Sequence, residues 1–395
     1  MLTPKVSVIL PCYNMELFLS ESLDSVLSQT LSEIEVICVN DGSTDSTLNI
    51  LQAYQQKDPR ITIIDQENQG VAAARNVAIH SATGEYIAFM DPDYFYPDAH
   101  TLELLYTKAS GNNALICGGS LNMYYHDENR MFSDHKGIYE KFNLFTEGFI
   151  DYFDYQFDFG FYRFLYKRSL LLENNIFFPP YARFQDPPFF IRAMIAAGSF
   201  YSTPQPTYVY RRDFQEPRTS WSSIKIQDML RGHLDDLNIS AQHNLSELHA
   251  LTVKRLDVSD VVDPVMVSLQ AGNEKTLALL LQISQAIRPE LLQEAGMKLN
   301  AAGGYTLRVL RQALREVSGA RATRRVLERK EKEIVSLTRK LNDTQNSVSY
   351  RIGGMITLVP RKLRGVVRCC KDHGVFYTVT YAAKRIRRKL CKTKS

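Results

Sequence analysis

Apolar runs of strand length alternate with segments of helical periodicity through the first third of the chain. The runs expected to form strands are Val6–Leu10, Glu35–Val39, Ile61–Ile64, Tyr86–Met90 and Ala114–Cys117. Between them, apolar residues recur at helical spacing in Met15–Gln29, in a segment capped by Ser43 or Thr44, in one opened by Gly70 and in one around Leu102. This alternation predicts an α/β fold with a doubly wound, mostly parallel sheet flanked by helices.

Four polar loops follow the first four predicted strands. They are Pro11–Asn14, Asn40–Asp45, Glu67–Gly70 and Asp91–Asp93. Because the carboxyl ends of parallel strands share one edge of a sheet, we expect these loops to converge on one crevice. Turn chemistry alone explains Asn, Asp and Gly in any single loop. Four such loops at one edge, two of them with clustered carboxylates, favour a binding site.

The last of these loops carries two carboxylates, Asp91 and Asp93, separated by one proline. Such a pair supplies the hard oxygen ligands that Mg²⁺ or Mn²⁺ prefers. In isolation, two solvated turn aspartates explain the same pattern. In the crevice, Asp41 could accept hydrogen bonds from a base or ribose. Arg75 could reach phosphates or brace the aspartates, the alternative being a surface salt bridge.

Several classes of protein are not supported. The first strand is not followed by Gly-x-Gly-x-x-Gly, and no Gly-Lys-Ser/Thr loop occurs, which argues against dinucleotide and P-loop sites. Cys12, Cys38 and Cys117 lie in or beside apolar runs, as expected for buried thiols in a reducing compartment. With no signal-peptide pattern and no apolar run of membrane-spanning length, we expect a cytoplasmic protein.

Four consecutive motifs carry a family resemblance. They are VSVILPCYN (Val6–Asn14), VNDGSTDST (Val39–Thr47), NQGVAAARN (Asn68–Asn76) and GEYIAFMDPD (Gly84–Asp93). In this order and spacing they resemble the motifs of family 2 glycosyltransferases with the GT-A fold, of the bacterial surface or capsular polysaccharide type. The resemblance implies an inverting transferase that uses a nucleoside-diphosphate sugar, usually UDP-linked, with Mg²⁺ or Mn²⁺. It weakens after Asp93 and ends near Arg212.

The resemblance also implies roles for individual residues of the donor site. These are Pro11, Tyr13, Asn14 and Asp41 around the nucleoside, with Asp41 on the uracil, Arg75 beside the donor, Asp91 facing the ribose or sugar, and Asp93 holding the metal. By the same resemblance Asp186 is the catalytic base that accepts the proton of the acceptor hydroxyl.

The chain departs from the family pattern at three places. Tyr94 stands where a third aspartate often follows, so the acidic cluster is thinner. Gln185 replaces the glutamate that usually precedes the base; with one like charge fewer, Asp186 should ionise more easily. No histidine follows in Tyr208–Asp213, so Arg211 or Arg212 could contact the diphosphate instead, or be surface arginines.

The remaining chain divides by composition. We expect a GT-A domain over 1–220, a helical extension over 221–318, a charged helix or short coiled coil over 319–350, and a basic amphipathic tail over 351–395. The tail holds thirteen Lys or Arg against one acidic residue, Asp372, with apolar residues interleaved. An anionic membrane surface suits this pattern, a solvated tail being the alternative. Nucleic acid is not expected, because no nucleic-acid-binding motif accompanies the tail.

Taken together, these patterns predict a glycosyltransferase that elongates a surface or capsular glycan on a glycan or lipid-linked acceptor. The aromatic-rich stretch between Leu121 and Phe190 is explained by packing, with one or two rings available to stack on the acceptor sugar. Two alternatives stay open. A nucleotidyltransferase would share the nucleotide crevice and the metal but release pyrophosphate. A catalytically impaired nucleotide-sugar-binding module would bind the donor without turnover.

Overall fold

The computed structural model describes residues 3–212, 221–300, 304–305 and 307–311. The described residues divide into two compact units, one that ends at Ile239 and one that begins at Ser240. The division therefore falls inside helix α8 (Ser223–Gln242), whereas the sequence places the predicted boundary after residue 220. The predicted charged helix over 319–350 and the basic tail over 351–395, with its membrane attachment, lie outside the described residues.

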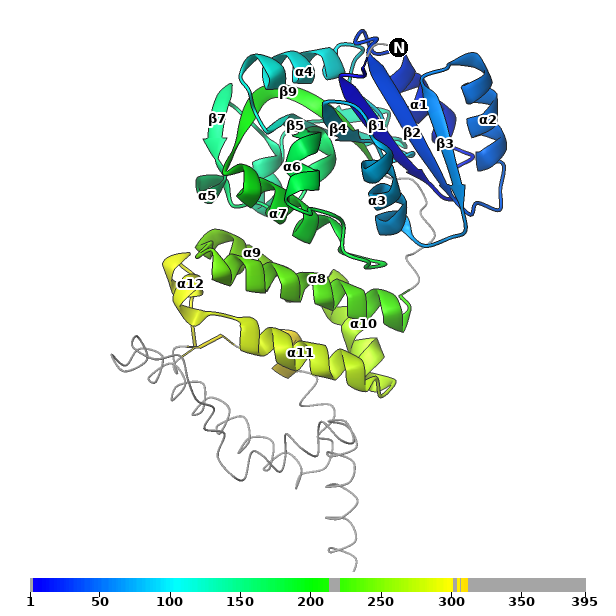
Figure 1. The fold of residues 1–395 in the computed structure, drawn as a ribbon. Coiled ribbons are helices and arrows are strands. Elements are labelled where there is room, and N and C mark those ends of the chain that lie inside the picture. The colour runs from blue at the N-terminus through cyan, green and yellow to red at the C-terminus, as the bar shows by residue number, and fades with distance from the viewer. Residues whose placement is uncertain (1–2, 213–220, 301–303, 306, 312–395) are drawn as a thin grey trace, which may run out of the picture. The chain divides into compact units, whose positions relative to one another are not determined.

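A mixed sheet forms the centre of the first unit (Figure 1). In the described part of the chain its strand order is β3-β2-β1-β4-β8-β5-β9-β7, with β6 paired to β5. The strands are β1 (Val6–Cys12), β2 (Ile34–Asp41), β3 (Ile61–Gln66), β4 (Tyr86–Phe89), β5 (Ile116–Tyr125), β6 (Arg130–Phe132), β7 (Gly148–Asp151), β8 (Phe164–Lys167) and β9 (Ser199–Arg212).

The pairing of the strands confirms the predicted parallel arrangement of the first four. Strand β1 pairs parallel with β2 and with β4, and β2 pairs parallel with β3. Strand β8 lies antiparallel between β4 and β5, so the fifth predicted strand is not a neighbour of the fourth. Strand β9 returns parallel to β5. The carboxyl ends of β1 to β4 consequently share one edge of the sheet, which is the condition for the predicted crevice.

Helices connect and flank the strands. They are α1 (Leu19–Leu27), α2 (Thr47–Lys57), α3 (Val71–Ser81), α4 (Thr101–Gly111), α5 (Tyr152–Tyr155), α6 (Arg168–Glu173) and α7 (Asp186–Ala197), with short 3₁₀ turns at Gly137–Phe142 and Phe161–Arg163. The predicted cap of α2 at Ser43 or Thr44 is wrong. Helix α2 starts later, where Asp45 Oδ1 accepts the N–H of Thr47 at 2.9 Å, because Ser43 and Thr44 contact Asn14 instead.

Aromatic side chains fill the core behind the carboxyl end of β4. Phe89 is fully buried and meets the rings of Phe161, Phe178 and Phe189 edge-on, with ring centroids 5.4 to 5.5 Å apart. Phe178 and Phe189 stack on each other at 3.9 Å. Edge-to-face and stacked rings combine large apolar burial with favourable quadrupole contacts. The predicted packing role is therefore confirmed for these rings of the aromatic-rich stretch.

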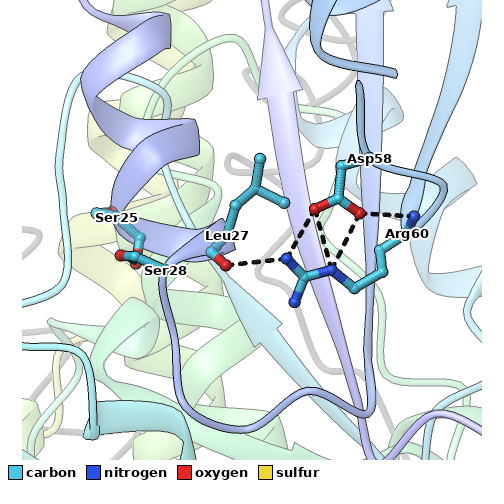
Figure 2. Close-up of polar contacts among 5 residues, drawn as sticks. All are labelled: Ser25, Leu27, Ser28, Asp58 and Arg60. Atoms are coloured by element: carbon cyan, nitrogen blue, oxygen red, sulfur yellow. Dashed lines mark hydrogen bonds and ion pairs between the residues drawn. The ribbon is translucent and has the colours of Figure 1, made fainter. Parts of the chain in front are cut away.

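Arg60, in the turn before β3, links this turn to the end of α1. Arg60 Nη2 donates to the Leu27 carbonyl at the end of α1 at 2.9 Å and lies 2.7 Å from Asp58 Oδ2, as Figure 2 shows. Its Nε donates to the same carboxylate. This planar, two-pronged pairing fixes the guanidinium and so anchors α1 to the start of β3.

Beyond α8, the second unit is helical, as predicted. Its described helices are α9 (Ser246–Leu256), α10 (Ser259–Gln270), α11 (Glu274–Ala286) and α12 (Pro289–Glu294). Buried His249 joins them, with Nδ1 2.8 Å from Ser240 Oγ and Nε2 accepting the N–H of Arg288 at 2.9 Å. Across the described residues, no helix has both the length and the apolar character that crossing a bilayer requires.

Candidate functional site

The loops after β1 and β2 hold each other at the edge of the sheet. Asn14 adopts a left-handed φ of 53°, and its Oδ1 accepts the N–H of Thr44 at 2.8 Å. Its own N–H donates to Ser43 Oγ at 3.1 Å. Beside it, Pro11 is buried in β1 and Tyr13 leaves 45% of its surface exposed. The Tyr13 ring is therefore accessible at this loop.

Asp41, at the end of β2, binds the loop after β3. Its Oδ1 accepts from Gln66 Nε2 at 2.8 Å and from the Gln69 N–H at 2.9 Å, and its Oδ2 accepts the Gly70 N–H at 2.8 Å. Gly70, with φ of 89°, precedes the first residue of α3 in a conformation that glycine adopts without strain. In the structure, buried Asp41 therefore orients the start of α3.

Arg75 is the centre of the site. It projects from the second turn of α3, keeps 4% of its side chain exposed, and donates from Nη2 to Asp91 Oδ1 at 2.6 Å and from Nη1 to Asp186 Oδ1 at 2.7 Å. Its guanidinium carbon lies 4.8 Å from the ring centroid of Phe161 and 5.0 Å from that of Phe178. The structure shows Arg75 bracing Asp91 and Asp186, whereas the sequence leaves open a brace of Asp91 and Asp93, a contact with phosphates or a surface salt bridge.

This arrangement shifts the pKa values of Arg75 and Asp186. Burial alone would lower the pKa of Arg75, but Asp91 and Asp186 more than offset burial and raise it, so the guanidinium stays charged. The carboxyl of Asp186, with 32% of its side chain exposed, has its pKa raised by desolvation and by Asp91, while Arg75 acts in the opposite direction. Asp186 is thus a carboxylate of increased basicity held by a permanent cation.

Strand β9 supports the loop that carries Asp91 and Asp93. The buried hydroxyl of Tyr208 accepts the Asp91 N–H at 3.0 Å. Arg211 Nε donates to the Asp93 carbonyl at 3.1 Å, and its Nη2 pairs with Glu21 of α1. Backbone contacts from two side chains of one strand fix the direction in which the acidic loop leaves β4.

The two arginines expected near the diphosphate occupy different environments. Arg211 is buried among the rings of Phe18, Phe95 and Tyr124, at 5.3 to 5.7 Å from their centroids. It is therefore placed to support the acidic loop. Arg212 is exposed and lies 5.6 Å from the Tyr210 ring, which leaves its guanidinium accessible to an anionic ligand.

A divalent ion would have few protein ligands here. Among the described residues, no group of three or more His, Cys, Asp or Glu side chains is arranged to hold a metal. Mg²⁺ is commonly bound by one or two carboxylates together with substrate phosphates, and the Asp91–Asp93 pair fits that donor set. Oδ1 of Asp91 accepts from Arg75 Nη2 at 2.6 Å, so Asp91 would present its other oxygen to an ion.

Some contributors to the site are not apparent from the sequence. Phe161 and Phe178 support Arg75, and Tyr208 positions Asp91. Each belongs to the aromatic-rich part of the chain or to β9. These segments contain many aromatic residues, and the sequence does not show which of them contact the site. The only sequence signal for Tyr208 is the alternation Tyr208-Val-Tyr210 in a strand pattern, which places both tyrosines on one face.

Comparison with known proteins supports the same family and fold. The model of glycosyl transferase family 2 matches residues 7–172. The chain is 34% identical over 221 residues to the uncharacterized glycosyltransferase EpsJ of Bacillus subtilis, covering 53% of this chain and 62% of EpsJ. It is 33% identical over 213 residues to a poly(ribitol-phosphate) beta-glucosyltransferase of Bacillus spizizenii, covering 52% and 32%. The chain thus spans less than two thirds of either relative.

Among solved structures, S. aureus TarS 1–349 in complex with UDP-GlcNAc is similar to this chain. The TM-score is 0.58 at 21% sequence identity, over 73% of this chain and 82% of TarS 1–349. At this level of identity the similarity establishes the fold, and the predicted GT-A-type architecture with a helical C-terminal region is confirmed.

Proposed function

This chain belongs to glycosyl transferase family 2 through residues 7–172, and from that premise we propose that it transfers a sugar from a UDP-sugar to a hydroxyl of a glycan or lipid-linked acceptor. The observation that carries the proposal is the bridge from Arg75 to Asp91 and Asp186. It joins the end of a sheet strand, where the donor is expected, to the acid that is expected to act on the acceptor. The UDP-GlcNAc bound by TarS and the polymer, poly(ribitol-phosphate), in the name of the Bacillus spizizenii relative support this choice of substrates.

Asp186 is the proposed general base. It is the first residue of α7, its Oδ1 is taken by Arg75, and its side chain is partly exposed. The raised pKa of its carboxyl makes it a stronger base than an ordinary aspartate. By accepting the proton of the acceptor hydroxyl during attack on the anomeric carbon, it would promote a single displacement that inverts the anomeric configuration.

The donor would lie along the loops at the edge of the sheet. Tyr13 offers an exposed ring to the base, and Asp41 keeps the loop before α3 in place. Asp91 would face the ribose or sugar, and Asp93 would hold Mg²⁺ or Mn²⁺ together with the diphosphate. A bound ion would supply charge neutralisation for the departing diphosphate. Arg212, whose side chain is exposed, would add a second positive charge.

The proposal is tested by incubating the full chain with a panel of UDP-, GDP- and ADP-sugars in the presence of Mn²⁺. A glycosyltransferase releases the nucleoside diphosphate, and we expect UDP. Release of pyrophosphate from nucleoside triphosphate and sugar phosphate would indicate a nucleotidyltransferase. Tight UDP binding without release, in the presence of glycan and lipid-linked acceptors, would indicate a binding module.

A further inference from the structure

The loop that leads into Asp186 contains an unusual backbone conformation. Phe184, two residues before Asp186, has a left-handed φ of 66°. For a bulky aromatic residue this region is an outlier, because its Cβ crowds the backbone. Such a conformation persists only where the surroundings over-determine it, and it occurs preferentially at functional sites.

Helix α8 supplies those surroundings. The Phe184 ring stacks on His233 with centroids 3.8 Å apart and planes 15° apart. His233 is fully buried and is itself fixed, since its Nδ1 donates to the Met229 carbonyl at 2.8 Å. At Gly232, an added Cβ would lie 2.7 Å from Phe184 Cδ1 and would overlap the Phe184 carbonyl oxygen. Glycine is therefore required at this position for the loop to approach the helix.

Two carboxylates of the same helix hold the preceding residues of the loop. Asp228 Oδ2 accepts the Ala182 N–H at 3.0 Å, and Asp235 Oδ2 accepts from the Tyr181 hydroxyl at 3.1 Å. Four side-chain or glycine positions of α8 thus contact the loop over residues 181–184. The sequence assigns no chemical role to this helix.

We propose that α8, through Gly232 and His233, holds Phe184 in its left-handed conformation and thereby positions Asp186 against Arg75. Gly232, His233 and Phe184 are positioning residues, because they act through Asp186. The inference rests on the proposed function, in which Asp186 is the base. It adds the first helix of the C-terminal part to the catalytic unit, which through Asp186 already reaches beyond the family-matched residues 7–172.

Two variants test the proposal in the full chain. Gly232→Ala should displace the Phe184 carbonyl, and Phe184→Gly should remove the stacked ring while tolerating the left-handed φ. Gly111→Ala in α4, where an added Cβ meets nothing within 4 Å, and Asn175→Gly, at another left-handed residue, are the matched controls. The readouts are kcat for UDP release from the UDP-sugar that the donor panel selects, the Kd of UDP with Mn²⁺ by calorimetry, and the pH–rate profile.

For Gly232→Ala we expect kcat to fall about 100-fold, because a displacement of about 1 Å at a reacting group has effects of that size. Phe184→Gly should lower kcat at least about tenfold on the same reasoning. UDP affinity should stay within about twofold of wild type, and the acid limb of the profile should move to higher pH as Asp186 loses its contact with Arg75. Both controls should match wild type.

Wild-type kcat and an unshifted acid limb in Phe184→Gly would overturn the inference. If Gly232→Ala does not fold, the result for Phe184→Gly alone decides whether the inference stands. Asp186→Asn, measured in parallel, separates the role of Asp186 as the base from the positioning role of α8. If Asp186→Asn keeps full turnover, the assignment of Asp186 as the base fails, and with it the premise of this inference. If Asp186→Asn is inactive while Gly232→Ala and Phe184→Gly retain wild-type kcat, the positioning role of α8 alone is wrong.

Discussion

Arg75 Nη1 donates to Asp186 Oδ1 across 2.7 Å, although 111 positions separate the two residues in the chain. The contact joins α3 to the first turn of α7. Because the other amino group of Arg75 binds Asp91, a single buried cation orients both acids.

Replacing Arg75 by Met should destabilise the fold and reduce activity. The change leaves Asp91 and Asp186 close together without their cation, and breaking a buried ion pair costs about 3 kcal/mol. Urea denaturation should therefore show a loss of about that size in the free energy of unfolding. Arg60→Met is the control, since both members of its pair are 21–25% exposed and we expect a loss of about 1 kcal/mol. Equal losses in the free energy of unfolding of Arg75→Met and Arg60→Met would contradict the role of Arg75 as a buried brace between Asp91 and Asp186.

The pH dependence of turnover should report the raised pKa of Asp186. A base acts only when ionised, so kcat/KM should fall as pH drops through a pKa above the ordinary aspartate value of 3.8. Since the folded state binds this proton more tightly than the unfolded chain, Asp186 stabilises the fold below the unfolded pKa, and that stability is lost as pH rises through the folded pKa. In Arg75→Met the acid limb should move to still higher pH, because the opposing charge is gone. An acid limb at or below the ordinary value would count against the base.

Asp41→Asn should loosen the loop before α3. The Asp41 carboxylate accepts three hydrogen bonds, from Gln66, Gln69 and Gly70. In asparagine an NH₂ group replaces one of the two oxygens, so at least one of these N–H groups faces another donor instead of an acceptor. We expect a loss of about 1–3 kcal/mol in the free energy of unfolding, together with weaker UDP binding in calorimetry. Asp65→Asn is the control, because Asp65 is exposed and accepts from Asn40 alone among the hydrogen bonds described. Unchanged UDP affinity in Asp41→Asn would show that this loop does not bind the nucleotide.

Asp93→Asn should weaken the dependence on a divalent ion. If Asp93 is a ligand, the Mn²⁺ concentration for half-maximal UDP release should rise at least about tenfold. Chelation of the metal should abolish release by the wild type. Asp98→Asn, at an exposed residue whose carboxylate accepts the His100 N–H, should behave as wild type. A Mn²⁺ titration that is identical for Asp93→Asn and wild type would place the ion elsewhere.

The sequence predicts the first four strands and the edge at which their loops meet, because each motif stands at the end of an apolar run. It also identifies Arg75 and Asp186, but not the bond between them, since neither residue type nor spacing encodes a contact over such a separation. The insertion of antiparallel β8 between β4 and β5 is not predicted either. A four-residue strand in an aromatic-rich stretch has no periodicity that distinguishes it from buried coil.

The environment of the supporting residues is also beyond the sequence. Nothing in the sequence distinguishes Arg211 from an exposed arginine. In the structure it is buried between aromatic rings and bonded to Glu21 and to the Asp93 carbonyl. Its partners come from α1 and from the loop after β4. Only the folded sheet, in which β9 passes behind that loop, brings these three segments together.

The role of Asp186 as the general base is tested most directly by comparing Asp186→Asn with wild type for UDP release and for UDP binding with Mn²⁺. The asparagine keeps the shape of the side chain but cannot accept the acceptor's proton. We expect UDP release to fall by about 10²- to 10⁴-fold while the Kd of UDP stays within about twofold. Turnover equal to that of the wild type would contradict the assignment of Asp186 as the base.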